Sequence, residues 1–112
     1  MKHPDGNFRV NLPHLLPEEL TETLIMAQSI RIERIISTGQ SSPPGFWYDQ
    51  DENEWLVLFQ GEAELEIAGA EDEIAVVRLS AGDYILIPAH QKHRVQSTSK
   101  TTVTVWLAVF FQ

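Results

Sequence analysis

The sequence predicts an all-β fold, either two packed antiparallel sheets or a small closed barrel. The first observation is that apolar and polar residues alternate over short runs, most clearly in Glu62–Ile67, where small and branched apolar residues alternate with glutamates. The second is the frequency of turn residues between these runs, as in Thr38–Gly45, a segment that no helix or central strand tolerates. Strands of this kind each bury one face, so they need a second layer to pack against.

About eight segments carry the strand pattern, and all of them are short. They are Ser29–Ser37, Phe46–Gln50, Glu54–Gln60, Glu62–Ile67, Ile74–Leu79, Tyr84–Pro88, Arg94–Ser97 and Thr102–Phe111. The last segment has apolar residues on both faces, and such a strand needs cover on both sides. A second copy of the chain is the simplest cover, so the sequence predicts a homodimer.

The N-terminal region is predicted to be a loose arm over residues 1–16, followed by a single domain over residues 17–112. A short helix is expected at about Pro17–Ala27. Proline and two acidic residues suit the first turn of a helix, and Leu20 and Leu24 recur at helical spacing. A helix this short is marginal alone, so its apolar face should cover another part of the fold.

The composition narrows the class of partner. The chain has 112 residues, no cysteine and a formal net charge of −8. This charge argues against nucleic acid or an anionic membrane as partner, and the lack of cysteine excludes disulfides and thiolate chemistry. No apolar run approaches the roughly 18 residues that a membrane span needs, and Met1–Arg9 lacks the apolar core of a signal peptide. A cytoplasmic location is therefore expected.

Two stretches concentrate the side chains that carry chemistry. Trp47–Glu54 contains carboxylates, an amide and a phenol directly before an apolar strand. Gly82–Arg94 contains a second apolar strand that breaks at Pro88 and is followed by His90 and His93. Carboxylates and amides in one segment and imidazoles in another are typical ligands of a hard or borderline metal ion.

The spacing of residues within these stretches is also distinctive. Glu54 is followed by six residues and then Gly61, while Gly82 is followed by five residues and Pro88, with His93 shortly after. This spacing resembles the paired motifs of the cupin family, whose members are small jelly-roll barrels. The resemblance implies a double-stranded β-helix barrel, here with one short N-terminal helix.

The resemblance covers about Ile30–Phe110 and is closest to a small single-domain bacterial subgroup with the run WYDQ, a following EW and a late PAH..HR. The chain departs from the family at the two histidines that usually precede the glutamate. Tyr48 and Gln50 hold those positions in one register, and Trp47 and Asp49 hold them in the other. The familiar set of three histidines and one glutamate is therefore absent.

The resemblance leaves a reduced set of candidate ligands. A strand alternates its faces, so Tyr48 and Gln50 should point together into the barrel and Asp49 away from it. The implied metal site contains Glu54 and His93 with Gln50, and Asp49 stays open as the alternative to Gln50. Such a site would suit Mn, Fe(II), Ni or Zn, with waters completing the shell.

The same resemblance gives the remaining site residues their expected roles. Glu54 and Tyr48 are the candidate catalytic residues, because either could move a proton inside the cavity. His90 stands where the family usually has glycine, and it is expected to line the ligand pocket together with Tyr48. The expected ligand is a small polar organic molecule.

Three functions stay open at this point. The first is a metal-dependent enzyme that acts on a small polar molecule in the barrel. The second is a non-catalytic module that binds such a molecule as a sensor. The third is a degenerate barrel that holds no metal and serves as a structural dimer. The fold does not choose among them, so the sequence leaves open whether the protein is an enzyme.

Overall fold

The computed structural model describes residues 3–112 and is an all-β fold, as the sequence predicts. Its elements are β1 (Leu20–Met26), β2 (Ile30–Ser37), β3 (Asn53–Gln60), β4 (Glu62–Ala68), a 3-10 turn η1 (Ala70–Asp72), β5 (Ile74–Ser80), β6 (Tyr84–Ile87), β7 (His93–Thr98) and β8 (Thr104–Phe111). Within this part of the chain, no helix is long and apolar enough to cross a membrane.

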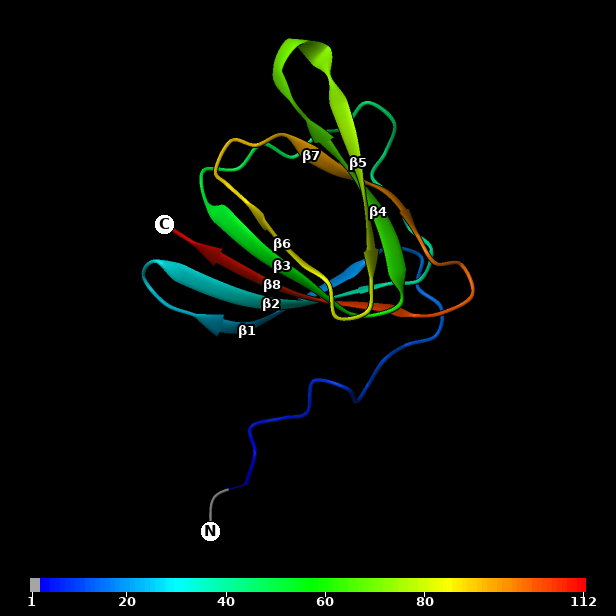
Figure 1. Ribbon diagram of the computed structural model, residues 1–112. Helices are drawn as coiled ribbons and strands as arrows, with labels where there is room; N and C mark the ends of the chain where they lie inside the picture. Colours follow the sequence, from blue (N-terminus) through cyan, green and yellow to red (C-terminus); the bar gives the residue numbers. More distant parts are fainter. Residues whose placement is uncertain (1–2) are drawn as a thin grey trace.

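The strands form two antiparallel sheets that face each other (Figure 1). The five-stranded sheet has the order β1-β2-β8-β3-β6, and the three-stranded sheet has the order β5-β4-β7. This arrangement fits a jelly roll, but the expected closed barrel is wrong, because strand pairing does not run continuously from one sheet to the other. A single isolated bridge between Tyr48 and His93 links the loop before β3 to β7.

The predicted helix at Pro17–Ala27 is also wrong, because most of this segment is strand β1. β1 pairs with β2 along its length, from Leu20 opposite Ile36 to Met26 opposite Arg31. The register shifts between Thr23 and Ile25, so a bulge interrupts the alternation of faces. Pairing with β2 therefore overrides the helical spacing of the leucines, which is the usual outcome when local propensity is weak.

The predicted strand at Phe46–Gln50 is reduced to one bridging residue, Tyr48. The other predicted strands are present, and their ends lie within a few residues of the predicted ones. The division into an arm (1–16) and a domain (17–112) stays a prediction, and residues 1–2 lie outside the part of the chain that the structure describes.

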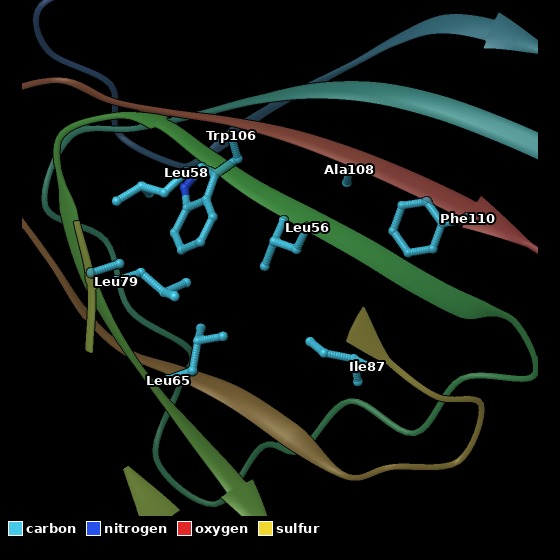
Figure 2. Close-up of a cluster of buried hydrophobic side chains, with 9 residues drawn as sticks. Leu56, Leu58, Leu65, Leu79, Ile87, Trp106, Ala108 and Phe110 are labelled. Carbon is cyan, nitrogen blue, oxygen red and sulfur yellow. The ribbon is translucent and has the colours of Figure 1, made fainter. Parts of the chain in front are cut away.

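The hydrophobic core lies between the two sheets. Figure 2 shows Leu56, Trp106 and Phe110 of the five-stranded sheet pointing toward Leu65 of β4. Leu58, Leu65, Ile87 and Trp106 are each no more than 2% exposed. Four members of this cluster, Leu56, Leu65, Trp106 and Phe110, also border a hollow that contains polar side chains.

Gly61 makes the tight turn from β3 to β4 possible. Its φ of +95° lies in the left-handed region, and a Cβ at this position would lie 2.7 Å from the Cα of Thr104 and closer still to its hydroxyl. Because backbone cannot move aside cheaply, only glycine fits here. The turn thereby brings the start of β4 against the start of β8.

The N-terminal segment is tied to the outside of the five-stranded sheet (Figure 1). The guanidinium of Arg34 on β2 donates hydrogen bonds to the carbonyls of Phe8 and Val10 and to the carboxylate of Glu22. The Phe8 ring meets the Phe59 ring edge-on, with centroids 5.0 Å apart. Backbone carbonyls of this segment thus satisfy a cation that is buried on the outer face.

Candidate functional site

A cavity of about 210 Å³ lies between the two sheets. Its wall combines apolar side chains with an unusual number of ionisable ones. The apolar part comes from Ile35, Leu56, Leu65, Val95, Trp106 and Phe110, and the polar part from Glu19, Thr21, Arg31, Glu33, Tyr48, Gln50, Glu54 and His93. A hollow with an apolar wall and a few convergent polar groups is the usual form of a small-molecule site.

Glu54 and His93 meet in this cavity from opposite sheets. Glu54 lies near the start of β3, opposite Phe110 of β8, and His93 is the first residue of β7. Both are buried, at 6% and 5% exposure, and Glu54 Oε1 lies 3.5 Å from His93 Nε2. The two hairpins that were singled out from the sequence therefore bring one carboxylate and one imidazole into the same pocket.

The hydrogen bonds of His93 define its tautomer. Its Nδ1 lies 2.9 Å from the carbonyl of Gln91, and because a carbonyl only accepts, Nδ1 carries the proton. In the neutral ring Nε2 then has a free lone pair on the side of Glu54. Burial lowers the pKa of His93, but hydrogen bonds to Glu54 and to the Gln91 carbonyl, together with the charge of Glu54, outweigh it and hold the pKa above its ordinary value.

Tyr48 holds His93 in place. The backbone N–H of each residue donates to the carbonyl of the other, at 2.7 and 3.1 Å, and the phenol ring stacks on the imidazole with centroids 5.4 Å apart. Burial raises the pKa of Tyr48, and the charges of Glu19 and Glu54 raise it further. The phenol therefore stays protonated and is a hydrogen-bond donor in the cavity.

The residues next to Tyr48 alternate as a strand would, although strand pairing in this loop is limited to the bridge between Tyr48 and His93. Gln50 lines the cavity together with Tyr48. Asp49 instead accepts a hydrogen bond from His90, with Oδ1 and Nδ1 2.8 Å apart. Of the two alternatives left open by the sequence, Gln50 is the one that faces the cavity.

His90 lies on the surface rather than in the cavity wall. Its side chain is 64% exposed and lies between two carboxylates, 2.8 Å from Asp49 and 3.5 Å from Asp51. Its backbone N–H donates to the carbonyl of Gln50. His90 also has a φ of +65°, a conformation that favours glycine. Its expected role in the pocket is therefore not supported by its position, and it links the two loops instead.

Glu19 is a cavity residue that the sequence pattern did not reveal. The residue as a whole is exposed, but its carboxylate reaches into the cavity and accepts a hydrogen bond from the hydroxyl of Ser37, at 3.0 Å. The indole N–H of Trp106 donates to the same hydroxyl, at 3.1 Å. Burial raises the pKa of Glu19, the Ser37 hydrogen bond lowers it, and the charge of Glu54 raises it, with a net upward shift.

Arg31 and Glu33, on β2, also line the cavity and were not among the candidates. Arg31 donates from Nε to Glu33, at 2.9 Å, and from Nη1 to Glu52, at 3.0 Å. Its guanidinium lies over the Phe110 ring, 4.2 Å from the centroid. Alternation along β2 puts both residues on one face, but nothing in the sequence shows that this face points inward.

The donor set is incomplete for a metal ion. Across residues 3–112, no group of three or more histidine, aspartate or glutamate side chains is arranged to hold one. In the cavity, Glu54 and His93 have suitable spacing, because bonds of about 2.1 Å to a tetrahedral ion place neighbouring donors about 3.4 Å apart. The amide of Gln50 is the remaining predicted ligand in the cavity, whereas Asp49 is bonded to His90.

Comparisons with known proteins agree with this architecture. A family model of the cupin domain matches residues 33–110. A solved structure from Ralstonia eutropha JMP134, which carries the provisional name mannose-6-phosphate isomerase, is 41% identical, with a TM-score of 0.90 over 100% of this chain and 99% of that one. A comparison with curated proteins gave no match.

More distant solved structures show the fold alone. A cupin superfamily protein from Desulfitobacterium hafniense DCB-2 is 19% identical, with a TM-score of 0.66 over 85% of this chain and 78% of that one. An enzyme named HppE, solved in its Fe(II) form with an alternative substrate, is 18% identical, with a TM-score of 0.69 over 86% of this chain and 51% of that one.

Proposed function

This chain belongs to the cupin family, and we propose that its cavity binds a small polar organic molecule and exchanges protons with it through His93 and Glu54. The observation that carries the proposal is the buried contact between these two groups in a cavity whose wall is part apolar and part polar. Ionisable groups that are buried and paired in a hollow are typical of sites that perform chemistry.

The arrangement of His93, Glu54 and Tyr48 in the cavity suits a proton relay. In neutral His93 the Nε2 lone pair faces the cavity, so Nε2 can accept a proton from a bound ligand and later return it. The carboxylate of Glu54 stabilises the imidazolium that forms in between. The Tyr48 phenol stays protonated and can donate a hydrogen bond to a ligand oxygen as charge develops there.

The relative from Ralstonia eutropha suggests a reaction class. Its provisional name denotes an isomerase of a sugar phosphate, and it aligns with this chain over almost its full length. Isomerisation of a hydroxylated carbonyl compound needs a base that moves a proton between neighbouring carbons and a donor for the oxygen. His93 and Tyr48 would fill these two roles, so proton-transfer isomerisation is the class we favour.

Metal binding is a second candidate, and one observation favours it. Nε2 of His93 is free of a backbone partner, its Nδ1 is held by a carbonyl, and the Glu54 carboxylate lies at the spacing of an adjacent ligand. Gln50 would supply an amide oxygen. A bound Mn, Fe(II), Ni or Zn ion would act as a Lewis acid. Two strong donors fall short of a metal centre, and the proton relay needs only the side chains of His93, Glu54 and Tyr48.

The first test compares two histidines that are three residues apart. His93→Ala should weaken the binding of D-mannose, measured by NMR titration of the full chain, by about tenfold or more, while His90→Ala should change it by less than about twofold. D-mannose should perturb the indole N–H of Trp106, which belongs to the cavity wall. Equal losses in both variants, or no response at Trp106, would contradict the proposal.

Turnover and metal content separate the alternatives. If the native chain converts D-mannose to its ketose and His93→Ala does not, the protein is an enzyme. Binding of D-mannose without conversion supports a sensor. Metal analysis after exposure to Mn, Fe(II), Ni and Zn addresses the second candidate. Stoichiometric metal in the native chain that is lost in His93→Ala and kept in His90→Ala supports a metal centre. Metal retained in His93→Ala excludes this residue as a ligand.

A further inference from the structure

The cavity is small in comparison with most small-molecule sites. Its volume of about 210 Å³ lies below the range of roughly 300–1,000 Å³ that is usual for small-molecule sites. A ligand that fills it must therefore be very small or must extend beyond it. An extended ligand would need space next to the cavity.

A second hollow adjoins the cavity. This outer groove, of about 340 Å³, shares Glu19, Tyr48 and Val95 with the cavity wall. Its other sides are formed by Pro17 and Glu18 before β1 and by the turn at residues 40–43 after β2. Because three side chains belong to both hollows, the cavity and the outer groove lie on either side of Glu19 and Tyr48.

The wall of the outer groove is held in a fixed shape. The hydroxyl of Ser42 accepts a hydrogen bond from the Val95 N–H at 2.9 Å, and the amide of Gln40 donates to the Leu16 carbonyl at 2.8 Å. The Gln40 carbonyl accepts a hydrogen bond from Thr98 at 2.6 Å. These bonds fasten the turn at residues 40–43 to β7 and to the segment before β1, so the groove is formed before a ligand arrives.

The charges of the two hollows determine which ligand fits. The outer groove is lined by Glu18 and Glu19, and its lining includes no lysine, arginine or histidine among residues 3–112. In the cavity, Arg31 is already paired with two carboxylates and His93 lies against Glu54. A phosphate or carboxylate group would meet several carboxylates and cations that are already paired, and a low-dielectric site strengthens that repulsion.

We propose that the cavity and the outer groove form one site for an elongated, uncharged, hydroxylated molecule, and that anionic analogues are rejected. This inference rests on the proposed function, because it extends the same ligand site. One end of the ligand lies in the cavity near His93, and the rest passes between Glu19 and Tyr48 into the groove. Carboxylate and phenol at this junction are partners for ligand hydroxyls.

A chain of hydrogen bonds holds Glu19 at the junction between the cavity and the outer groove. Trp106 donates to Ser37 and Ser37 donates to Glu19, so one carboxylate oxygen is held and the other is left for the ligand side of the junction. Glu19 precedes residue 33, where the match to the cupin domain begins. The proposed site therefore includes a residue that lies outside the region matched by the family model.

The test uses three probes of graded length and charge. They are erythritol, D-glucitol and D-glucitol 6-phosphate, titrated into the ¹⁵N-labelled full chain. Erythritol should perturb the backbone amide of His93 and leave that of Ser41 unchanged, whereas glucitol should perturb both. Glucitol 6-phosphate should bind about tenfold more weakly than glucitol. Equal or tighter binding of the phosphate, or a glucitol response confined to the cavity, would overturn the inference.

A charge reversal in the groove makes the test sharper. Glu18→Lys should raise the affinity for glucitol 6-phosphate by about fivefold and leave glucitol within about twofold, since a cation now faces the phosphate. Glu73→Lys is the matched control, because it makes the same change in net charge at an exposed residue outside both hollows. An equal gain in both variants would show a general field effect and would count against the groove.

The outcomes separate this inference from the proposed function. If erythritol and glucitol both perturb only the cavity, the proposed function survives and the extended site fails. If neither probe perturbs the cavity, both fail. If the probes bind as expected but D-mannose is not converted to its ketose, the extended site stands and the proton relay is what needs revision.

Discussion

On its inner face the five-stranded sheet carries Arg31, Glu33 and Glu54, whereas on its outer face it carries Trp55 and Leu86. The usual distribution is the reverse, with apolar residues inside and charged ones in solvent. The inner charges are tolerated because each has a partner: Arg31 binds Glu33 and Glu52, and Glu54 lies against His93. The outer apolar residues have no such explanation within a single copy of the chain.

The outer face is covered over only part of its area. Arg34 is buried there by the N-terminal segment, whose carbonyls it binds. Farther along the sheet, Trp55 and Tyr84 pack against each other, yet Tyr84 and Leu86 are 68% and 54% exposed. The two faces of one sheet therefore differ, with the proposed ligand site on one side and an exposed apolar surface on the other.

The largest effect we predict is on the outer face. The native chain should be a homodimer in solution, with a mass near twice 12.7 kDa by light scattering, because a second copy would cover Leu86 and its neighbours. Leu86→Glu should give the monomer mass. Ile74→Glu places the same charge on an exposed residue of the three-stranded sheet and should leave the dimer intact. A native mass near 12.7 kDa at micromolar concentration would disprove the dimer.

The next largest effect is on the free energy of unfolding, and it should differ between a tryptophan on the inner face and one on the outer face. Trp106→Phe removes the indole N–H that donates to buried Ser37, so the free energy of unfolding should fall by about 1–3 kcal/mol. Both substitutions are made in the Leu86→Glu variant, which should be monomeric. In that background Trp55→Phe should change the free energy of unfolding by less than about 1 kcal/mol. Chemical denaturation of each variant in that background measures both values. A larger loss for Trp55 would show that the outer face, and not the inner one, carries the fixed network.

The third effect is a pH dependence of stability that arises from His93 in the cavity. The pKa of His93 is raised in the folded chain, so its contribution to stability is complete below about pH 6.5 and is lost as pH rises through the folded pKa. Denaturation of EDTA-treated protein should show this decline. Glu54→Gln should reduce it, because the carboxylate that raises the pKa is gone. A decline of the same size in Glu54→Gln would contradict the role of this pair.

The smallest effect concerns the loop outside both faces. His90 has a left-handed backbone conformation, which costs an L-residue roughly 1–2 kcal/mol and costs glycine little. His90→Gly removes this cost, but it also removes an exposed contact to Asp49. We expect the free energy of unfolding to change by less than about 2 kcal/mol, with D-mannose binding unaltered. Thermal unfolding and the NMR titration measure the two quantities. A clear loss of binding would return His90 to the ligand site.

Sequence reasoning succeeded where the relevant information was local. Alternation along a strand was enough to expect Tyr48 and Gln50 on one side and Asp49 on the other. Motif spacing was enough to single out Glu54 and His93, although their contact across two sheets depends on the whole fold. Their catalytic and metal-binding roles stay predictions.

Sequence reasoning failed where distant pairing decided the structure. The segment containing Glu19 has a proline, two acidic residues and leucines at helical spacing, so its local pattern favours a helix. Pairing of β1 with β2 makes it a strand instead, and only then does the Glu19 carboxylate reach Ser37. Arg31 and Glu33 lie on the inner face of β2 and Arg34 lies on its outer face, so polarity alone does not reveal which face is inside.

β1 pairs only with β2 and forms one border of the five-stranded sheet. A chain trimmed to begin at residue 33, where the match to the cupin domain starts, would lose this border together with Glu19. The trimmed protein would keep the family's glycine, proline and histidine positions, yet its hollow would be wider, less acidic and open along one side. Choosing where to start the polypeptide is thus also a choice about the shape and charge of the cavity between the sheets.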